Sequence, residues 1–63
     1  MNAFLTAFAT ETGLDNNEAA DQWSAFSAML SRRDRESIEC GGSRQGKREG
    51  KKFLAMYPDK SAA

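Results

Sequence analysis

The chain has 63 residues, nine basic and nine acidic side chains, and a single cysteine. A chain of this length forms one domain at most, and its small core leaves little net stability. An intrachain disulfide is excluded because there is no second cysteine, and the lack of histidine argues against a structural zinc site.

Residues 2–12 are predicted to form a short first helix. Phe4 and Phe8 are four positions apart and fall on one helical face. Gly13 follows as a natural left-handed stop for the helix. Because so short a helix is marginal alone, we expect it to pack against another element.

Residues 16–39 are predicted to form the second helix. Asp15, with a glutamate three residues later, is typical of a capping box at the helix start. A stripe at helical spacing follows, formed by Ala19, Trp23, Phe26 and Leu30. One continuous helix is favoured because Ile38 extends this stripe. The segment SRRD, which begins at Ser31, is itself a capping-box pattern, so a break near Ser31 stays open.

Residues 44–57 are predicted to form the third helix, ended by Pro58. One face would carry Gly46, Gly50, Phe53 and Tyr57, and the other Arg44, Lys47, Arg48, Lys51 and Lys52. Each glycine disfavours a helix by about 1 kcal/mol relative to alanine, but a flexible arm would not segregate residues in this way. We interpret the glycines as a smooth packing surface that admits a bulky side chain such as Trp23 or Phe26.

These elements predict an all-α protein, a small bundle or hairpin of two to three helices. Residues 1–57 would form the single domain and residues 58–63 a tail. A strand is not expected, because the chain has no valine and no alternating apolar run. With six aromatic residues and no covalent or metal staple, a homodimer is expected, with the stripe of Trp23, Phe26 and Leu30 facing its own copy.

The aromatic residues are the first candidate functional set, since such side chains dominate protein interfaces. The predicted protein interface consists of Phe4, Phe8, Trp23, Phe26, Leu30, Phe53 and Tyr57. The same residues would also serve as a hydrophobic core. The leading hypothesis is a small non-enzymatic regulator or inhibitor that docks this helical surface on a larger protein.

The basic residues give the alternative, a module that binds nucleic acid. The predicted phosphate contacts are Arg44, Lys47, Arg48, Lys51 and Lys52. Residues 1–30 carry no Lys or Arg, so the positive charge is concentrated in the second half, and Phe53 and Tyr57 could stack on bases. Against this, the isoelectric point of 6.2 is low for a dedicated nucleic-acid domain, and a solvated helix face is the simpler interpretation.

No catalytic residue, cofactor or metal is expected. Cys40 has no histidine to act as its base, and it lies beside Glu39, which disfavours a thiolate. The N-terminal segment lacks a basic region before its apolar stretch, which is not typical of a signal peptide. No apolar run reaches the length of a membrane span. With one free thiol and no sign of an export signal, a cytoplasmic location is expected.

Overall fold

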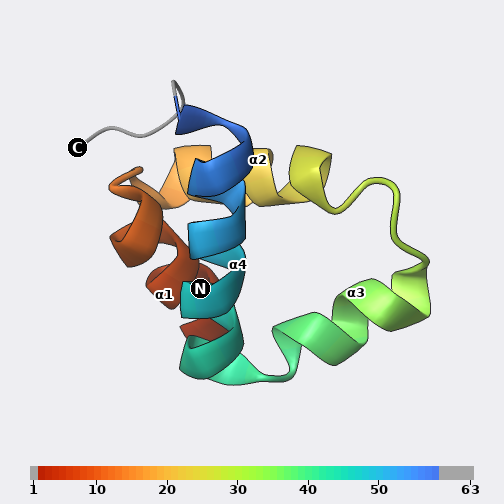
Figure 1. Cartoon of the computed structure of the whole chain (residues 1–63). Helices are drawn as coiled ribbons and strands as arrows, with labels where there is room; N and C mark the ends of the chain where they lie inside the picture. Colours follow the sequence, from red (N-terminus) through yellow and green to blue (C-terminus); the bar gives the residue numbers. More distant parts are fainter. Residues whose placement is uncertain (1, 59–63) are drawn as a thin grey trace.

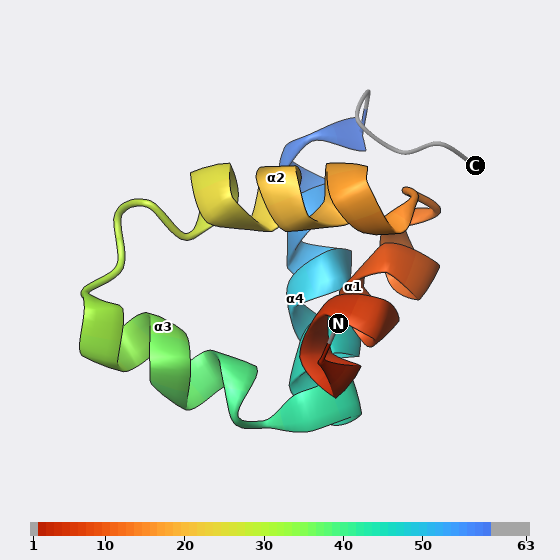
Figure 2. The ribbon, with the colours of Figure 1, turned by 180° about the vertical axis from the view of Figure 1, so that it is seen from behind.

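The computed structural model describes residues 2–58, which form four helices and no strand. The helices are α1 (Ala3–Thr12), α2 (Asn16–Phe26), α3 (Arg32–Glu39) and α4 (Gly42–Met56). Helices α1 and α4 lie side by side, α2 crosses the C-terminal end of α4, and α3 stands to one side (Figures 1 and 2). The predicted all-α class is confirmed, although four helices form instead of two or three.

The predicted ends of the first helix and the start of the second are confirmed. The Leu5 N–H donates to the side-chain oxygen of Asn2 at 2.8 Å, which caps the start of α1. Gly13 ends that helix with a left-handed φ of 76°. The Glu18 N–H donates to the Asp15 carboxylate at 2.8 Å and caps α2. Local capping chemistry therefore sets these three boundaries.

The continuous helix favoured for residues 16–39 is wrong, and the alternative break near Ser31 is confirmed. The Ser27 hydroxyl donates to the Trp23 carbonyl at 2.7 Å, and the Leu30 N–H closes a short turn onto the Ser27 carbonyl at 3.0 Å. The Asp34 N–H then donates to the Ser31 hydroxyl at 3.1 Å and starts α3. The second capping box therefore prevails over the extended stripe.

Aromatic rings from three helices fill the core. Phe4 and Phe8 of α1, Trp23 of α2 and Phe53 of α4 are at most 2% exposed. The ring centroids of Phe4 and Trp23 lie 4.7 Å apart, and those of Phe8 and Phe53 lie 5.6 Å apart. Tilted and edge-on contacts of this kind contribute about 0.5–1.5 kcal/mol each beyond the burial of apolar area. The described monomer thus uses most of its aromatic residues internally.

The predicted glycine contact of the last helix is present, but its expected partner is wrong. Gly46 and Gly50 are buried against α1, not against Trp23 or Phe26. A methyl group at Gly46 would overlap the Phe4 carbonyl oxygen, and one at Gly50 would lie 2.8 Å from the Glu11 Cβ. Because the two helices approach this closely, the backbone of α1 takes the space that a bulky side chain was expected to fill.

Helix α4 begins two residues before its predicted start. Gly42 has a φ of 67°, a left-handed conformation that turns the chain from α3 into α4 and that other residues adopt at a cost. The helix ends at Met56, with Tyr57 as its C-terminal cap and Pro58 next, as expected. The rest of the predicted tail lies outside the described residues.

Replacing Gly46 with alanine should destabilise the protein. Alanine favours a helix over glycine by about 1 kcal/mol, but overpacking costs about 1–3 kcal/mol, and the group that must move is backbone. Because backbone yields less readily than a side chain, the cost should lie in the upper part of its range, and we expect a net loss of about 1–2 kcal/mol, which lowers the melting temperature by roughly 4–16 °C. Gly50→Leu should also lower it, as measured by circular dichroism during heating.

Lys51→Ala is the matched control for this prediction. Lys51 lies on the exposed face of the same helix, one residue from Gly50. Its replacement should change the free energy of unfolding by no more than about 0.5 kcal/mol. A Gly46→Ala protein as stable as the wild type would show that α1 and α4 do not depend on this close contact.

Candidate functional site

The structure divides the seven predicted interface residues into two groups. Phe4, Phe8, Trp23 and Phe53 lie in the core with at most 2% of their surface exposed. Phe26 is half-buried, Leu30 is 39% exposed and Tyr57 is 42% exposed. Only the second group offers side-chain surface to another molecule, and within it Phe26 and Tyr57 are in contact.

An apolar groove lies between α2 and the C-terminal end of α4. We call it the Phe26–Tyr57 groove; its lining residues are Gln22, Ala25, Phe26, Phe53 and Tyr57, and its volume is about 180 Å³. The Tyr57 ring lies 6.1 Å from the Phe26 ring and 5.3 Å from the Phe53 ring, measured between centroids. These contacts hold Tyr57 in place while leaving part of its ring exposed.

Sequence analysis missed Met56, which is 61% exposed and adjoins Tyr57, although it does not itself line the groove. Met56 follows Phe53 by three positions, so helical spacing puts it near the same side of α4. That spacing was a usable signal for finding it. Met29 was also missed; it is 96% exposed, but it lies in the loop after α2 and does not line the groove.

The basic residues of α4 form a second surface, which we call the basic face. All five predicted phosphate contacts are exposed, namely Arg44, Lys47, Arg48, Lys51 and Lys52. They project away from the buried side of the helix, which carries Gly46, Glu49, Gly50 and Phe53. The structure thus brings the predicted basic set together on one side of one helix.

The charge of the basic face is almost uncompensated. Within residues 2–58, Lys52 is the only member of this face in an ion pair, with its Nζ 3.7 Å from the Glu49 carboxylate. Glu49 is the single acidic residue of α4, and it is only 5% exposed. The α4 carboxylate is therefore turned inward, and the outer surface presents cations without an interspersed acid.

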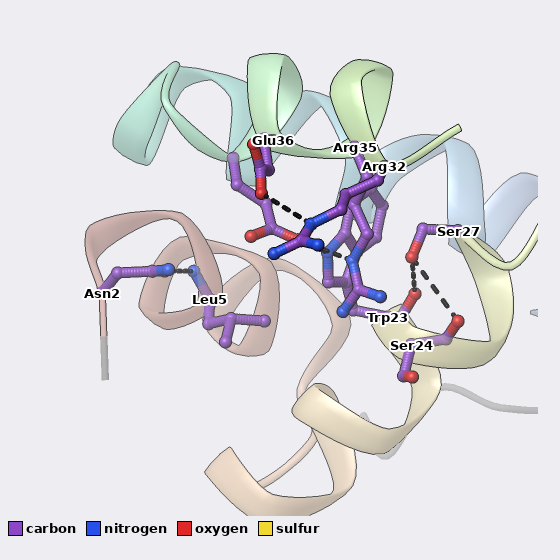
Figure 3. A network of polar contacts seen from close by, with 9 residues as sticks. Asn2, Leu5, Trp23, Ser24, Ser27, Arg32, Arg35 and Glu36 are labelled. Atoms are coloured by element: carbon purple, nitrogen blue, oxygen red, sulfur yellow. Dashed lines mark hydrogen bonds and ion pairs between the residues drawn. The ribbon is translucent and has the colours of Figure 1, made fainter. Parts of the chain in front are cut away.

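A polar cluster joins α3 to the core. The Trp23 indole N–H donates to the Glu39 carboxylate at 2.8 Å, and Arg35 donates to the same carboxylate oxygen at 2.9 Å. Figure 3 shows the side chains of Trp23 and Arg35, which reach this carboxylate from α2 and α3. Burial alone would raise the pKa of Glu39, but the hydrogen bonds from Trp23 and Arg35 and the charge of Arg35 outweigh it and lower the pKa below 4.5.

A further hollow lies at the start of α4, lined by Gly41, Arg44, Gln45 and Arg48, and thus by two cations of the basic face. Cys40 is a free, exposed thiol, and no three His, Cys, Asp or Glu side chains of this region gather to hold a metal ion. None of the described helices is long and apolar enough to cross a membrane. Comparison of the chain with protein-family models, with curated proteins and with solved structures finds no match.

Glu39→Gln should lower stability at neutral pH and leave it unchanged in strong acid. A carboxyl whose pKa is lower in the folded state stabilises the fold above its unfolded-state pKa, and this stabilisation disappears as the pH falls through the folded-state pKa. We expect the variant to be about 1 kcal/mol less stable near pH 7, since it loses hydrogen bonds to a charged group. The difference should disappear once the pH falls below the folded-state pKa of Glu39, as measured by urea unfolding followed by Trp23 fluorescence.

Glu36→Gln serves as the control for this pH dependence. Glu36 pairs with Arg32 at 3.3 Å, but the two side chains are 64% and 93% exposed. Such a surface pair contributes roughly 0–1 kcal/mol. An equal loss from Glu36→Gln and Glu39→Gln would mean that the link to Trp23 has no special role in holding α3.

Proposed function

We propose that this chain is a non-enzymatic regulator or inhibitor that binds a helix of a larger protein in the Phe26–Tyr57 groove. The observation that carries the proposal is the exposure of apolar surface at this place. Met56 and Tyr57 are 61% and 42% exposed beside a groove floored by Phe53, which belongs to the core. Apolar surface that adjoins a rigid core is typical of a protein-binding site.

The shape of the groove favours a protein side chain over a small molecule. Its volume of about 180 Å³ is below the roughly 300–1,000 Å³ of small-molecule sites. It is open on one side, where Tyr57 offers a ring and a hydroxyl. Phe26 and Phe53 already hold the Tyr57 ring in place. Binding would therefore cost little further side-chain entropy at this residue.

The charges beside the groove define the chemistry of the partner helix. Gln22 lines the groove and donates to the Glu18 carboxylate at 3.1 Å, and Asp21 next to it is exposed. Residues 1–30 contain no Lys or Arg to balance these acids. The complementary partner is an amphipathic helix with one large apolar anchor and flanking Lys or Arg residues.

The homodimer expected from the sequence would use the same groove. A second copy offers Met56 as the apolar anchor and Lys52 or Lys51 beside it, which is the charge pattern that the groove requires. In this arrangement Trp23, which is 1% exposed within its own core, would lie beneath the interface. Self-association is therefore an outcome that the experiment must separate from binding to a larger protein.

Photo-crosslinking from position 56 tests the proposal. A photoreactive residue in place of Met56 should capture one protein from an extract of the source cells, and the same residue at exposed Ser24 should not. The captured protein, once purified, should bind the wild type and bind Met56→Ser or Tyr57→Ser at least about tenfold more weakly, because a hot-spot side chain contributes about 2 kcal/mol or more and each 1.4 kcal/mol is about tenfold.

The double variant Met29→Ser and Leu30→Ser is the matched control. It also removes two exposed apolar side chains, 96% and 39% exposed, but unlike Met56, which precedes Tyr57, neither is next in the chain to a residue that lines the groove. Binding should be unaffected. Loss of binding in this control, with retention in Tyr57→Ser, would overturn the assignment of the groove. A captured band that proves to be the chain itself, together with a dimer mass by light scattering, would replace the larger partner by a second copy.

A further inference from the structure

We propose that the basic face of α4 binds the phosphate backbone of duplex nucleic acid without reading its base sequence. This surface is separate from the Phe26–Tyr57 groove, and the proposal does not depend on the protein partner. It follows from three features of the described residues: the register of the cations, the inward position of Glu49, and the absence of aromatic side chains from the basic face.

The cations are arranged as a line along the helix. From Arg44 to Lys52 they span about 12 Å of the helix axis. Duplex DNA carries one negative charge per about 1.7 Å of its axis, so about seven phosphate charges lie within that length. A linear polyanion can thus engage several of these side chains at once, whereas a single small anion would engage one or two.

The packing of α4 keeps this line of charge exposed and rigid. Gly46 seats the opposite side of the helix on the Phe4 backbone of α1, and Gly50 seats it on the Glu11 side chain. The helix cannot rotate to bury its cations without separating these contacts. Because Glu49 is 5% exposed and pairs with Lys52, the other four cations have no acidic partner among residues 2–58.

The basic face has no means of reading or stacking on bases. Phe53, expected from the sequence to stack, is 2% exposed inside the core. Tyr57 belongs to the groove and packs on Phe26 and Phe53. Single-stranded nucleic acid gains affinity when its bases stack on aromatic side chains, and the basic face offers none. The regularly spaced phosphates of a duplex are therefore the better ligand. Contacts to phosphate alone position a protein but carry no direct sequence information.

An anionic membrane surface fits this face less well. A helix that lies on a membrane inserts an apolar side into the boundary of the lipid tails. The apolar side of α4 is already packed in the protein through Phe53, and between the cations the outer surface holds no large apolar side chain. Duplex nucleic acid requires only the charges that the face presents.

Fluorescence anisotropy with a labelled random-sequence DNA duplex tests the inference. With about three to five phosphate contacts, affinity should fall roughly 40- to 500-fold between about 50 and about 200 mM salt. The double variant Lys47→Gln and Arg48→Gln should reduce the slope of log affinity against log salt by about two units. Circular dichroism should show unchanged helix content, since exposed cations contribute little stability.

The double variant Arg32→Gln and Arg33→Gln is the control, because it changes the net charge by the same amount as Lys47→Gln with Arg48→Gln. Both arginines are exposed on α3, away from the basic face, so the salt slope should stay near that of the wild type. Equal losses in the two double variants would reduce the effect to net charge and overturn the assignment. No binding at about 50 mM salt, a preference of more than about tenfold between two duplex sequences, or equal affinity for anionic phospholipid vesicles would overturn it as well.

Discussion

Two helices approach closely only where side chains do not separate them, and α4 meets this condition at Gly46 and Gly50. Contact with the α1 backbone at Gly46 and with the Glu11 side chain of α1 at Gly50 fixes the rotation of α4 about its own axis. Phe53 is then directed into the aromatic core, and Glu49 is directed inward with it. The five basic residues are left outside. One steric fit thus places the core residue, the inward acid and the exposed cations of the same helix.

The chain of aromatic contacts explains how so short a chain can form a core without a disulfide. Rings from α1, α2 and α4 touch in sequence, from Phe4 through Trp23 and Phe8 to Phe53 and on to Phe26 and Tyr57. The first four rings are buried, Phe26 is half-buried and Tyr57 is 42% exposed, because Tyr57 lies at the end of the last helix. The groove is therefore the place where the aromatic core reaches the surface. A partner side chain bound there would pack directly against core residues.

The sequence predicted those features that local chemistry decides. Asp15 and Gly13 mark helix ends by capping and by a left-handed turn, and the spacing of glycines and cations gave the two sides of α4. It could not predict which helix the glycines face, because α1 is distant in sequence. Nor could it separate core from surface among the aromatic residues, since both follow the same helical spacing. The break at Ser31 was a choice between two competing local signals; in the folded chain, the Glu39 link to Trp23 lies beyond that break.

The groove and the basic face lie on different sides of α4, so the two proposed partners do not compete for side chains except near Lys51 and Lys52. Their physical chemistry also differs. Binding through Met56 and Tyr57 would depend on apolar burial, which added salt weakens little, whereas phosphate contacts weaken steeply as counterions accumulate. The zero net charge of the chain limits long-range attraction to a polyanion, which leaves the local density of cations on α4 as the source of affinity. If the partner protein held in the groove also bound nucleic acid, it would raise the effective concentration of that nucleic acid near α4. Weak phosphate contacts would then be sufficient for the basic face to bind it.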